Sequence, residues 1–229
     1  MELDPKAVDH EAKFWRGFVK TERFAQWCAL EKTHELRDEV ALLLRYIVDN
    51  VNRVPLTSVV RILDVGSGPV SILHGLFYPD HRVVLDTADP LSPVYQEIFD
   101  FYTAGIKPPI AVGAEQVHLH GAQGYDVVHI SNALDHVVHV EEALRSMADC
   151  LRPKEGVLIV QGFVDEADHE RFQGFHQHNL SLDGENLRWR GINFETRIRP
   201  VDLGMRCLYA TQTQTALGRP WFLWVLVRA

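Results

Sequence analysis

Residues 62–71 read Ile62-Leu-Asp-Val-Gly-Ser-Gly-Pro-Val-Ser71, and this stretch decides the fold. An apolar run passes directly into a glycine-rich turn, and we expect a helix to follow. Gly66 and Gly68 permit positive backbone φ angles and leave room for a ligand close to the main chain. Ser71 stands where a dinucleotide-binding loop has its third glycine, and Asp64 would repel a pyrophosphate. The loop therefore disfavours NAD or FAD and suits a cationic or hydroxyl-bearing ligand.

Outside this stretch, short apolar runs alternate with helix-like segments. Runs typical of buried strands lie at residues 58–65, 82–89, 110–112, 125–130 and 156–161. Residues 140–151 have apolar side chains at helical spacing. Strands that alternate with helices predict an α/β fold with a doubly wound, Rossmann-like, mostly parallel sheet. At the C-terminus, residues 206–213 and 221–228 predict an antiparallel strand pair.

The N-terminal part is predicted to be helical, because large apolar residues recur every three or four positions over residues 8–50. We expect residues 1–56 to form a helical cap, and residues 57–229 to form one compact Rossmann-like catalytic domain. Aromatic residues on the first helix, Trp15 and Phe18, could close over a ligand as a lid. The alternative is that they are ordinary core residues.

Composition and charge narrow the function classes. The chain has 229 residues, is 46% hydrophobic and has a net charge of −8, which excludes wholesale disorder and disfavours a general nucleic-acid binder. The three cysteines, Cys28, Cys150 and Cys207, are far apart and have no zinc-like spacing. No apolar run approaches the roughly 18 residues that a membrane span needs. These features predict a reduced, cytoplasmic protein with a small-molecule partner, no nucleic acid, no membrane and no metal.

Several motifs together resemble the class I S-adenosylmethionine-dependent methyltransferases, over residues 59–160. They are Asp64-Val-Gly-Ser-Gly68, the acid Asp89 at the end of the next strand, Tyr125-Asp-Val-Val128, Ser131-Asn-Ala-Leu-Asp-His136 and Leu151-Arg-Pro-Lys-Glu-Gly156. The resemblance implies S-adenosyl-L-methionine as cofactor, with its ribose on Asp89, although Asp86 competes for that role. The sequence departs from the family pattern at Pro69 and Val70. The residues expected to contact the cofactor are Asp64, Gly66, Ser67, Gly68, Asp89, Pro90, Leu91, Ala114, Glu115 and Asn132.

Methyl transfer needs a nucleophile in line with the S–CH3 bond, and a base where that nucleophile carries a proton. His136 and His176 are the candidate catalytic residues, since histidine titrates in the useful range. A capping role at a helix start is the alternative for His136, and a solvated loop is the alternative for residues 176–179. We expect Trp15, Phe18, Asp135 and Asn179 to contact the substrate. His176 and His178 have no matching carboxylate set, so we predict no metal site there.

The sequence therefore predicts a methyltransferase that acts on a small molecule in secondary metabolism. A different enzyme could use the same pocket without transferring methyl, by cyclising the aminocarboxypropyl group to azetidine-2-carboxylate with release of methylthioadenosine. A non-catalytic cofactor-binding subunit is a lesser alternative. The acceptor and the oligomeric state are not predicted.

Overall fold

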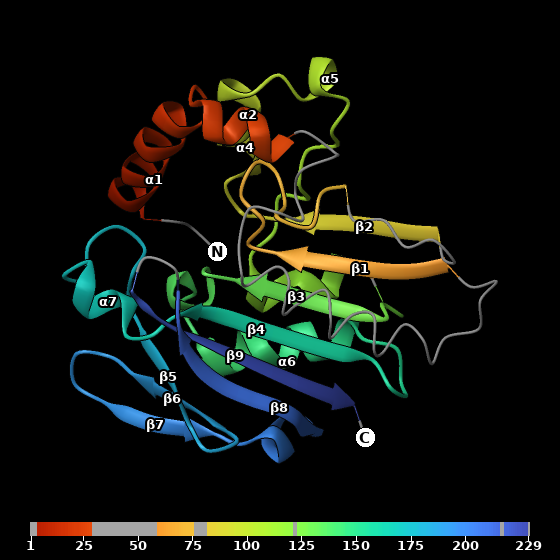
Figure 1. The fold of residues 1–229 in the computed structure, drawn as a ribbon, viewed down its shortest axis with the longest axis vertical. Helices are drawn as coiled ribbons and strands as arrows, with labels where there is room; N and C mark the ends of the chain where they lie inside the picture. Colours follow the sequence, from red (N-terminus) through yellow and green to blue (C-terminus); the bar gives the residue numbers. More distant parts are fainter. Residues whose placement is uncertain (1–3, 29–58, 76–81, 121–122, 216–217, 229) are drawn as a thin grey trace.

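A computed structural model describes residues 4–28, 59–75, 82–120, 123–215 and 218–228 (Figure 1). Its centre is a six-stranded sheet with the order β2-β1-β3-β4-β9-β8. The strands are β1 (Val59–Val65), β2 (Arg82–Ala88), β3 (Val127–Ser131), β4 (Val157–Phe163), β8 (Met205–Gln214) and β9 (Pro220–Arg228). β1 to β4 are parallel, and β9 and β8 form an antiparallel pair beside β4. The predicted Rossmann-like sheet with its C-terminal antiparallel pair is confirmed.

Apolar residues on both sides of β1 explain its central place in the sheet. Leu63 and Val65 join the larger core cluster, which α6 (Val140–Cys150) and η2 (Ala114–His120) cover. Val60 and Ile62 join a second cluster on the opposite face. A strand buried on both faces has a nearly continuous apolar run, and this is why β1 could be predicted from the sequence.

The N-terminal helices are α1 (Pro5–Phe18) and α2 (Glu22–Cys28), which lie together with α4 (Ser92–Ile98) near the carboxyl ends of β1 and β2 (Figure 1). Asp4 caps α1 by accepting a hydrogen bond from the backbone N–H of Lys6 at 3.0 Å. Ala7 of α1 shares a buried cluster with Leu91 and Tyr95. The remaining predicted helical residues and the expected boundary at residues 56 and 57 lie outside the described residues.

One prediction near the parallel strands was wrong in detail. The short strand expected at residues 110–112 is reduced to a single parallel bridge between Ala88 and Ile110. After the glycine loop, residues 72–75 form a turn, and the rest of the segment expected to be helical lies outside the described residues. None of the helices in the described ranges is long and apolar enough to cross a membrane.

The segment after β4, residues 165–174, is polar but mostly not helical. Only α7 (Glu166–His169) is helical there, because Asp165, Arg171 and Phe172 have φ angles between +52° and +56°, which an α-helix cannot accommodate. The short helices η3 (Leu134–His136), η4 (Pro200–Leu203) and α5 (Phe101–Ala104) complete the helical elements named in the described part.

A second, antiparallel sheet, which the sequence analysis did not predict, begins at residue 179. It consists of β5 (Asn179–Asp183), β6 (Asn186–Arg190) and β7 (Glu195–Ile198), in that order. Gly184 has a φ of +62° in the tight turn between β5 and β6. Leu180 and Leu187 join the core of the main sheet, so this hairpin is packed against the catalytic fold.

Candidate active site

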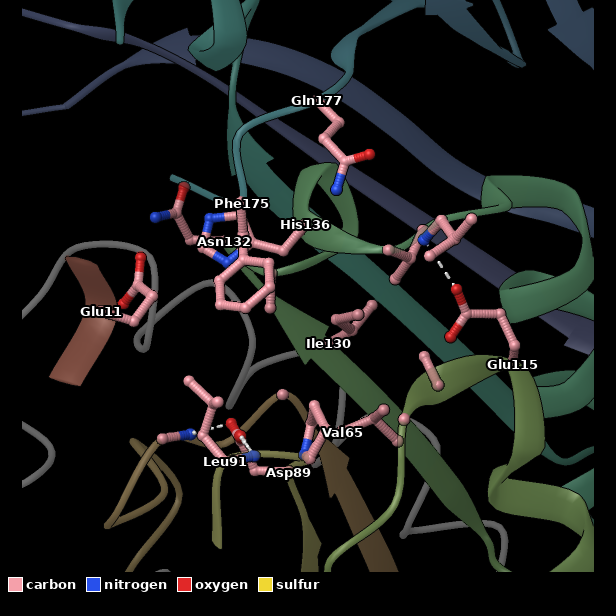
Figure 2. A pocket seen from close by; sticks show the side chains of 18 of the residues that line it. Glu11, Val65, Asp89, Leu91, Glu115, Ile130, Asn132, His136, Phe175 and Gln177 are labelled. Carbon is pink, nitrogen blue, oxygen red and sulfur yellow. Dashed lines mark hydrogen bonds between the residues drawn. The ribbon is translucent and has the colours of Figure 1, made fainter. Parts of the chain in front are cut away.

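A cavity of about 320 Å³ lies at the carboxyl ends of β1 and β3 (Figure 2). Its walls come from α1, the glycine loop, the residues after β2, the start of η2, and the turn after β3. Open α/β sheets bind ligands at this edge. The lining residues that the sequence predicted are Trp15, Gly66, Gly68, Asp89, Pro90, Leu91, Ala114, Glu115, Asn132 and His136.

The glycine loop has no room for side chains. Gly66 has a φ of +66°, and a Cβ atom there would lie 2.5 Å from the Cβ of Ala133. Gly68 has a φ of +65°, and a Cβ atom there would lie 2.9 Å from two ring carbons of Trp15. Both positions therefore require glycine for two reasons, the backbone conformation and the close contact with a neighbour.

Asp89 joins this loop to the end of β2. Its Oδ2 accepts a hydrogen bond from the N–H of Gly68 at 3.0 Å, and its Oδ1 accepts one from the N–H of Leu91 at 2.9 Å. Burial raises the pKa of the Asp89 carboxyl to about 6, although these backbone hydrogen bonds oppose that rise. The Tyr95 side chain also hydrogen-bonds to this carboxylate, which still has acceptor capacity for a ligand's hydroxyl group.

Asp64 lies behind the cavity and not in its lining. Its Oδ1 is 2.6 Å from Nδ1 of His129, and its Oδ2 accepts a hydrogen bond from the hydroxyl of Ser71 at 2.5 Å. Ser67 is buried and donates to the carbonyl of Gly68 at 3.0 Å, also outside the lining. These two expected cofactor contacts instead stabilise the loop from beneath.

The acidic residue that competed for the ribose role, Asp86, is also outside the cavity. It accepts a hydrogen bond from the Tyr125 hydroxyl at 2.9 Å. Asn132, by contrast, lines the cavity with a φ of +51°, a conformation that asparagine adopts more readily than most residues.

Glu115 forms part of the wall opposite α1. One carboxylate oxygen, Oε1, accepts hydrogen bonds from the N–H groups of Val138 at 2.7 Å and His139 at 3.3 Å. Its other oxygen turns toward the cavity (Figure 2). Glu115 therefore holds the segment that leads into α6 and has one oxygen left for a ligand.

His136 lies at the cavity wall, whereas Asp135 and His176 lie behind it. Nε2 of His136 is 3.1 Å from Nδ1 of His176, which in turn is 2.6 Å from Oδ2 of Asp135. Burial would raise the pKa of Asp135, but the two imidazoles outweigh it and lower that pKa. Burial likewise opposes a charged His176, but the hydrogen bond that its imidazole donates to Asp135 raises its pKa above the ordinary value.

The segment before β5 presents alternate residues to the cavity. Phe175 and Gln177 line it, whereas His176 between them and Asn179 at the start of β5 do not. Asn179 is buried and accepts a hydrogen bond from the N–H of Asp168 at 2.9 Å, which gives it a structural contact in place of the expected substrate contact. Alternation along an extended segment is the signal in the sequence that could have identified Gln177.

On α1, Trp15 lines the cavity but Phe18 does not. Phe18 stacks on Phe14 at a centroid distance of 5.6 Å and meets Phe24 edge-on at 5.7 Å. Glu11, which the sequence analysis missed, lines the cavity one helical turn before Trp15. Residues four apart share one face of a helix, so the position of Trp15 could have pointed to Glu11.

The charge of the lining has one sign. Asp4, Glu11, Asp89 and Glu115 contribute carboxylates, and no Lys or Arg is among the lining residues in the part of the chain that the structure describes. A cavity with this charge favours a cationic ligand over an anionic one.

Comparisons with known proteins agree with this geometry. The model of a family described as "Methyltransferase domain" matches residues 32–202. No curated protein sequence matches the chain. Similar solved structures include an S-adenosylmethionine-dependent methyltransferase from Clostridium acetobutylicum, with 11% identity, a TM-score of 0.54, and coverage of 95% of this chain and 98% of that one.

The fold is shared with two further structures. A protein described as a putative sarcosine dimethylglycine methyltransferase, from Galdieria sulphuraria, has 12% identity, a TM-score of 0.53, and coverage of 83% of this chain and 87% of that one. The N-methyltransferase NodS from Bradyrhizobium japonicum, in complex with S-adenosyl-L-homocysteine, has 11% identity, a TM-score of 0.51, and coverage of 85% and 90%. The family match covers more than half of the chain, and the chain therefore belongs to the methyltransferase domain family of class I S-adenosylmethionine-dependent enzymes.

Proposed function

We propose that this enzyme methylates a nitrogen or oxygen atom of a small molecule in secondary metabolism. The observation that carries the proposal is the cover that α1 forms over the cavity, with Trp15 directly against Gly68. A covered cavity of about 320 Å³ suits a cofactor beside a small acceptor and leaves little room for a macromolecule.

The cavity offers hydrogen-bond acceptors that suit the hydroxyl and amino groups of the cofactor. Asp89 would accept hydrogen bonds from the ribose hydroxyls, and the free oxygen of Glu115 would accept one from the adenine amino group. Gly66 and Gly68 would let the amino acid part pass close to the main chain. When bound, S-adenosylmethionine supplies an electrophilic methyl group on a sulfonium. The carboxylates of the lining and the face of Trp15 favour that positive charge.

The acceptor would lie at the side of the cavity formed by Asn132, His136 and Gln177. His136 would take the acceptor's proton, because among the candidate bases it is the imidazole that lines the cavity. His176 would act as a positioning residue through its contact with His136 at 3.1 Å. Asp135, buried beside both imidazoles, would hold the pair in place.

The test is to incubate the purified protein with S-adenosylmethionine alone and with a panel of small amines, phenols and acids, and to follow the nucleoside products by mass spectrometry. We expect S-adenosylhomocysteine only when an acceptor is present. The Asp89→Asn variant should lose this product, whereas Asp86→Asn should retain it. Methylthioadenosine formed without any acceptor, or cofactor binding with no product from any member of the panel, would contradict the proposal.

A further inference from the structure

Three parts of the chain bring metal-ligating side chains to one point at the cavity wall. Glu11 of α1, His136 of η3 and His176 before β5 each offer a donor atom, and these atoms lie within 4.8 Å of one another. Figure 2 shows Glu11 and His136 on the same side of the cavity. Oδ2 of Asp135 adds a fourth group, 2.6 Å from Nδ1 of His176 and 3.5 Å from Nε2 of His136.

Hydrogen bonding alone does not account for this arrangement. Nδ1 of His176 lies within hydrogen-bond distance of both Asp135 Oδ2 and His136 Nε2. An imidazole nitrogen carries either one proton or one lone pair, so it can donate to the carboxylate or accept from His136, but not both. One of the two short contacts is therefore left without a conventional hydrogen bond.

A metal ion would satisfy the same side chains. Imidazole nitrogens bind Zn²⁺ at about 2.0–2.1 Å, so two such nitrogens on one ion lie about 3–3.4 Å apart. The nitrogen atoms of His136 and His176 are 3.1 Å apart. The excess of carboxylates in the lining supplies the negative charge that a divalent cation requires.

We propose that Glu11, His136 and His176 bind a first-row divalent transition-metal ion of the Zn²⁺ type. Two imidazoles and a carboxylate favour such an ion over Mg²⁺ or Ca²⁺, which prefer sets made of oxygen ligands. Oδ2 of Asp135 contacts the same two nitrogen atoms, Nδ1 of His176 and Nε2 of His136, so the Asp135 carboxylate is the candidate fourth ligand of the ion.

Metal binding would link α1, which covers the cavity, to η3 and to the segment before β5. Glu11 belongs to α1. The segment before β5 lies close to that helix, since a Cβ atom on Gly174 would lie 2.9 Å from the ring of His10. The ion would fix α1 over the cavity and present an open coordination position to its interior. If the proposed methyl transfer holds, an oxygen or nitrogen of the acceptor would occupy that position and the ion would lower its pKa. The proton would then leave to water, because Nε2 of a metal-bound His136 could not accept it.

The experiment uses protein without a polyhistidine tag, treated with a chelator and then freed of it, in the absence of S-adenosylmethionine. Co²⁺ is titrated while its visible absorption is followed, and Zn²⁺ is titrated by calorimetry. We expect one equivalent of either ion to bind. Glu11→Gln, His136→Gln and His176→Gln should each weaken binding by about 10-fold or more, and Asp135→Asn should weaken it by roughly 10- to 100-fold.

His169→Gln is the matched control, because His169 is exposed and lies outside the cluster. Binding by this variant should equal that of the wild type. Glu11→Gln guards against misfolding, since glutamine is a good helix former and Glu11 is only partly buried in α1. Absence of saturable binding by the wild type, or equal binding by the wild type and the three ligand variants, would overturn the proposal. Cofactor affinity, measured separately without metal, distinguishes this failure from failure of the proposed methyl transfer.

Discussion

The indole ring of Trp15 lies directly over the backbone of Gly68, so closely that a Cβ atom on this glycine would come within 2.9 Å of two of the ring's carbons. The same ring meets Tyr95 edge-on at a centroid distance of 5.7 Å. A residue of the N-terminal helix thus contacts both the glycine loop and the helix that follows Asp89. The cover of the cavity and the cofactor loop are packed as one unit.

The Gly68→Ala substitution tests this contact. We expect it to lower S-adenosylmethionine affinity by about 10-fold or more, because the methyl group meets Trp15 and the residue must also keep a positive φ. Gly105→Ala is the matched control, since Gly105 has a φ of +67° but nothing within 4 Å of its Cβ position. Gly105→Ala should cost about 1–2 kcal/mol in the free energy of unfolding and leave affinity unchanged. Equal effects of both substitutions on affinity would show that the contact is unimportant.

The Trp15→Ala substitution tests the lid itself. We expect a loss of about 10-fold in cofactor affinity together with lower turnover, because the indole covers the loop and offers its face to the sulfonium. Phe14→Ala is the control, since Phe14 is the adjacent residue on α1, outside the lining and 54% exposed. Calorimetric titration with S-adenosylmethionine checks both. Unchanged affinity and turnover in Trp15→Ala would eliminate the lid.

Asp89 predicts a pH dependence of cofactor binding. Its pKa of about 6 lies above the ordinary value of 3.8, so its carboxylate is mostly ionised at neutral pH and takes up a proton as the pH falls through about 6. Affinity should fall over this range, because the protonated group has lost acceptor capacity for the ribose hydroxyls.

The sign of the stability change separates this effect from unfolding. Because the folded-state pKa is raised, the folded protein binds this proton more tightly than the unfolded chain does. The contribution of Asp89 to the free energy of unfolding therefore increases as the pH falls through about 6, while cofactor affinity decreases. Cofactor titrations by calorimetry between about pH 5 and pH 8 should show affinity falling with falling pH in the wild type and in Asp86→Asn. Asp89→Asn should bind the cofactor weakly at every pH in this range.

The parts of the site that could be predicted from sequence are those fixed by local geometry. Gly66 and Gly68 follow a buried strand directly, and Asp89 ends the next strand, so the parallel sheet places them at one edge. Glu11 and Gln177 could not be predicted in this way. Their place depends on how α1 and the segment before β5 pack against the sheet, which no local pattern specifies.

The differences between expectation and structure have a similar origin. Asp64 adjoins the glycine turn, but successive strand residues face opposite sides, and its side chain meets His129 on the neighbouring strand. The hairpin at residues 179–190 had a readable signal, because Asp183-Gly184 lies between runs that alternate apolar and polar residues.

The two oxygens of Glu115 have different roles, so a substitution can separate its contribution to stability from its contribution to cofactor binding. Its Oε1 holds the N–H groups of Val138 and His139, and its other oxygen faces the cavity. In Glu115→Gln the amide oxygen can keep both backbone contacts, but the amide nitrogen then faces the cavity as a donor. We expect thermal unfolding close to that of the wild type and weaker S-adenosylmethionine binding, because two donors, the amide and the adenine amino group, would oppose each other. Glu115→Ala should lose both the backbone hydrogen bonds and the cofactor contact. We expect its free energy of unfolding to fall by about 1 kcal/mol, as for loss of a helix cap. Wild-type cofactor affinity in Glu115→Gln would confine this residue to its structural role.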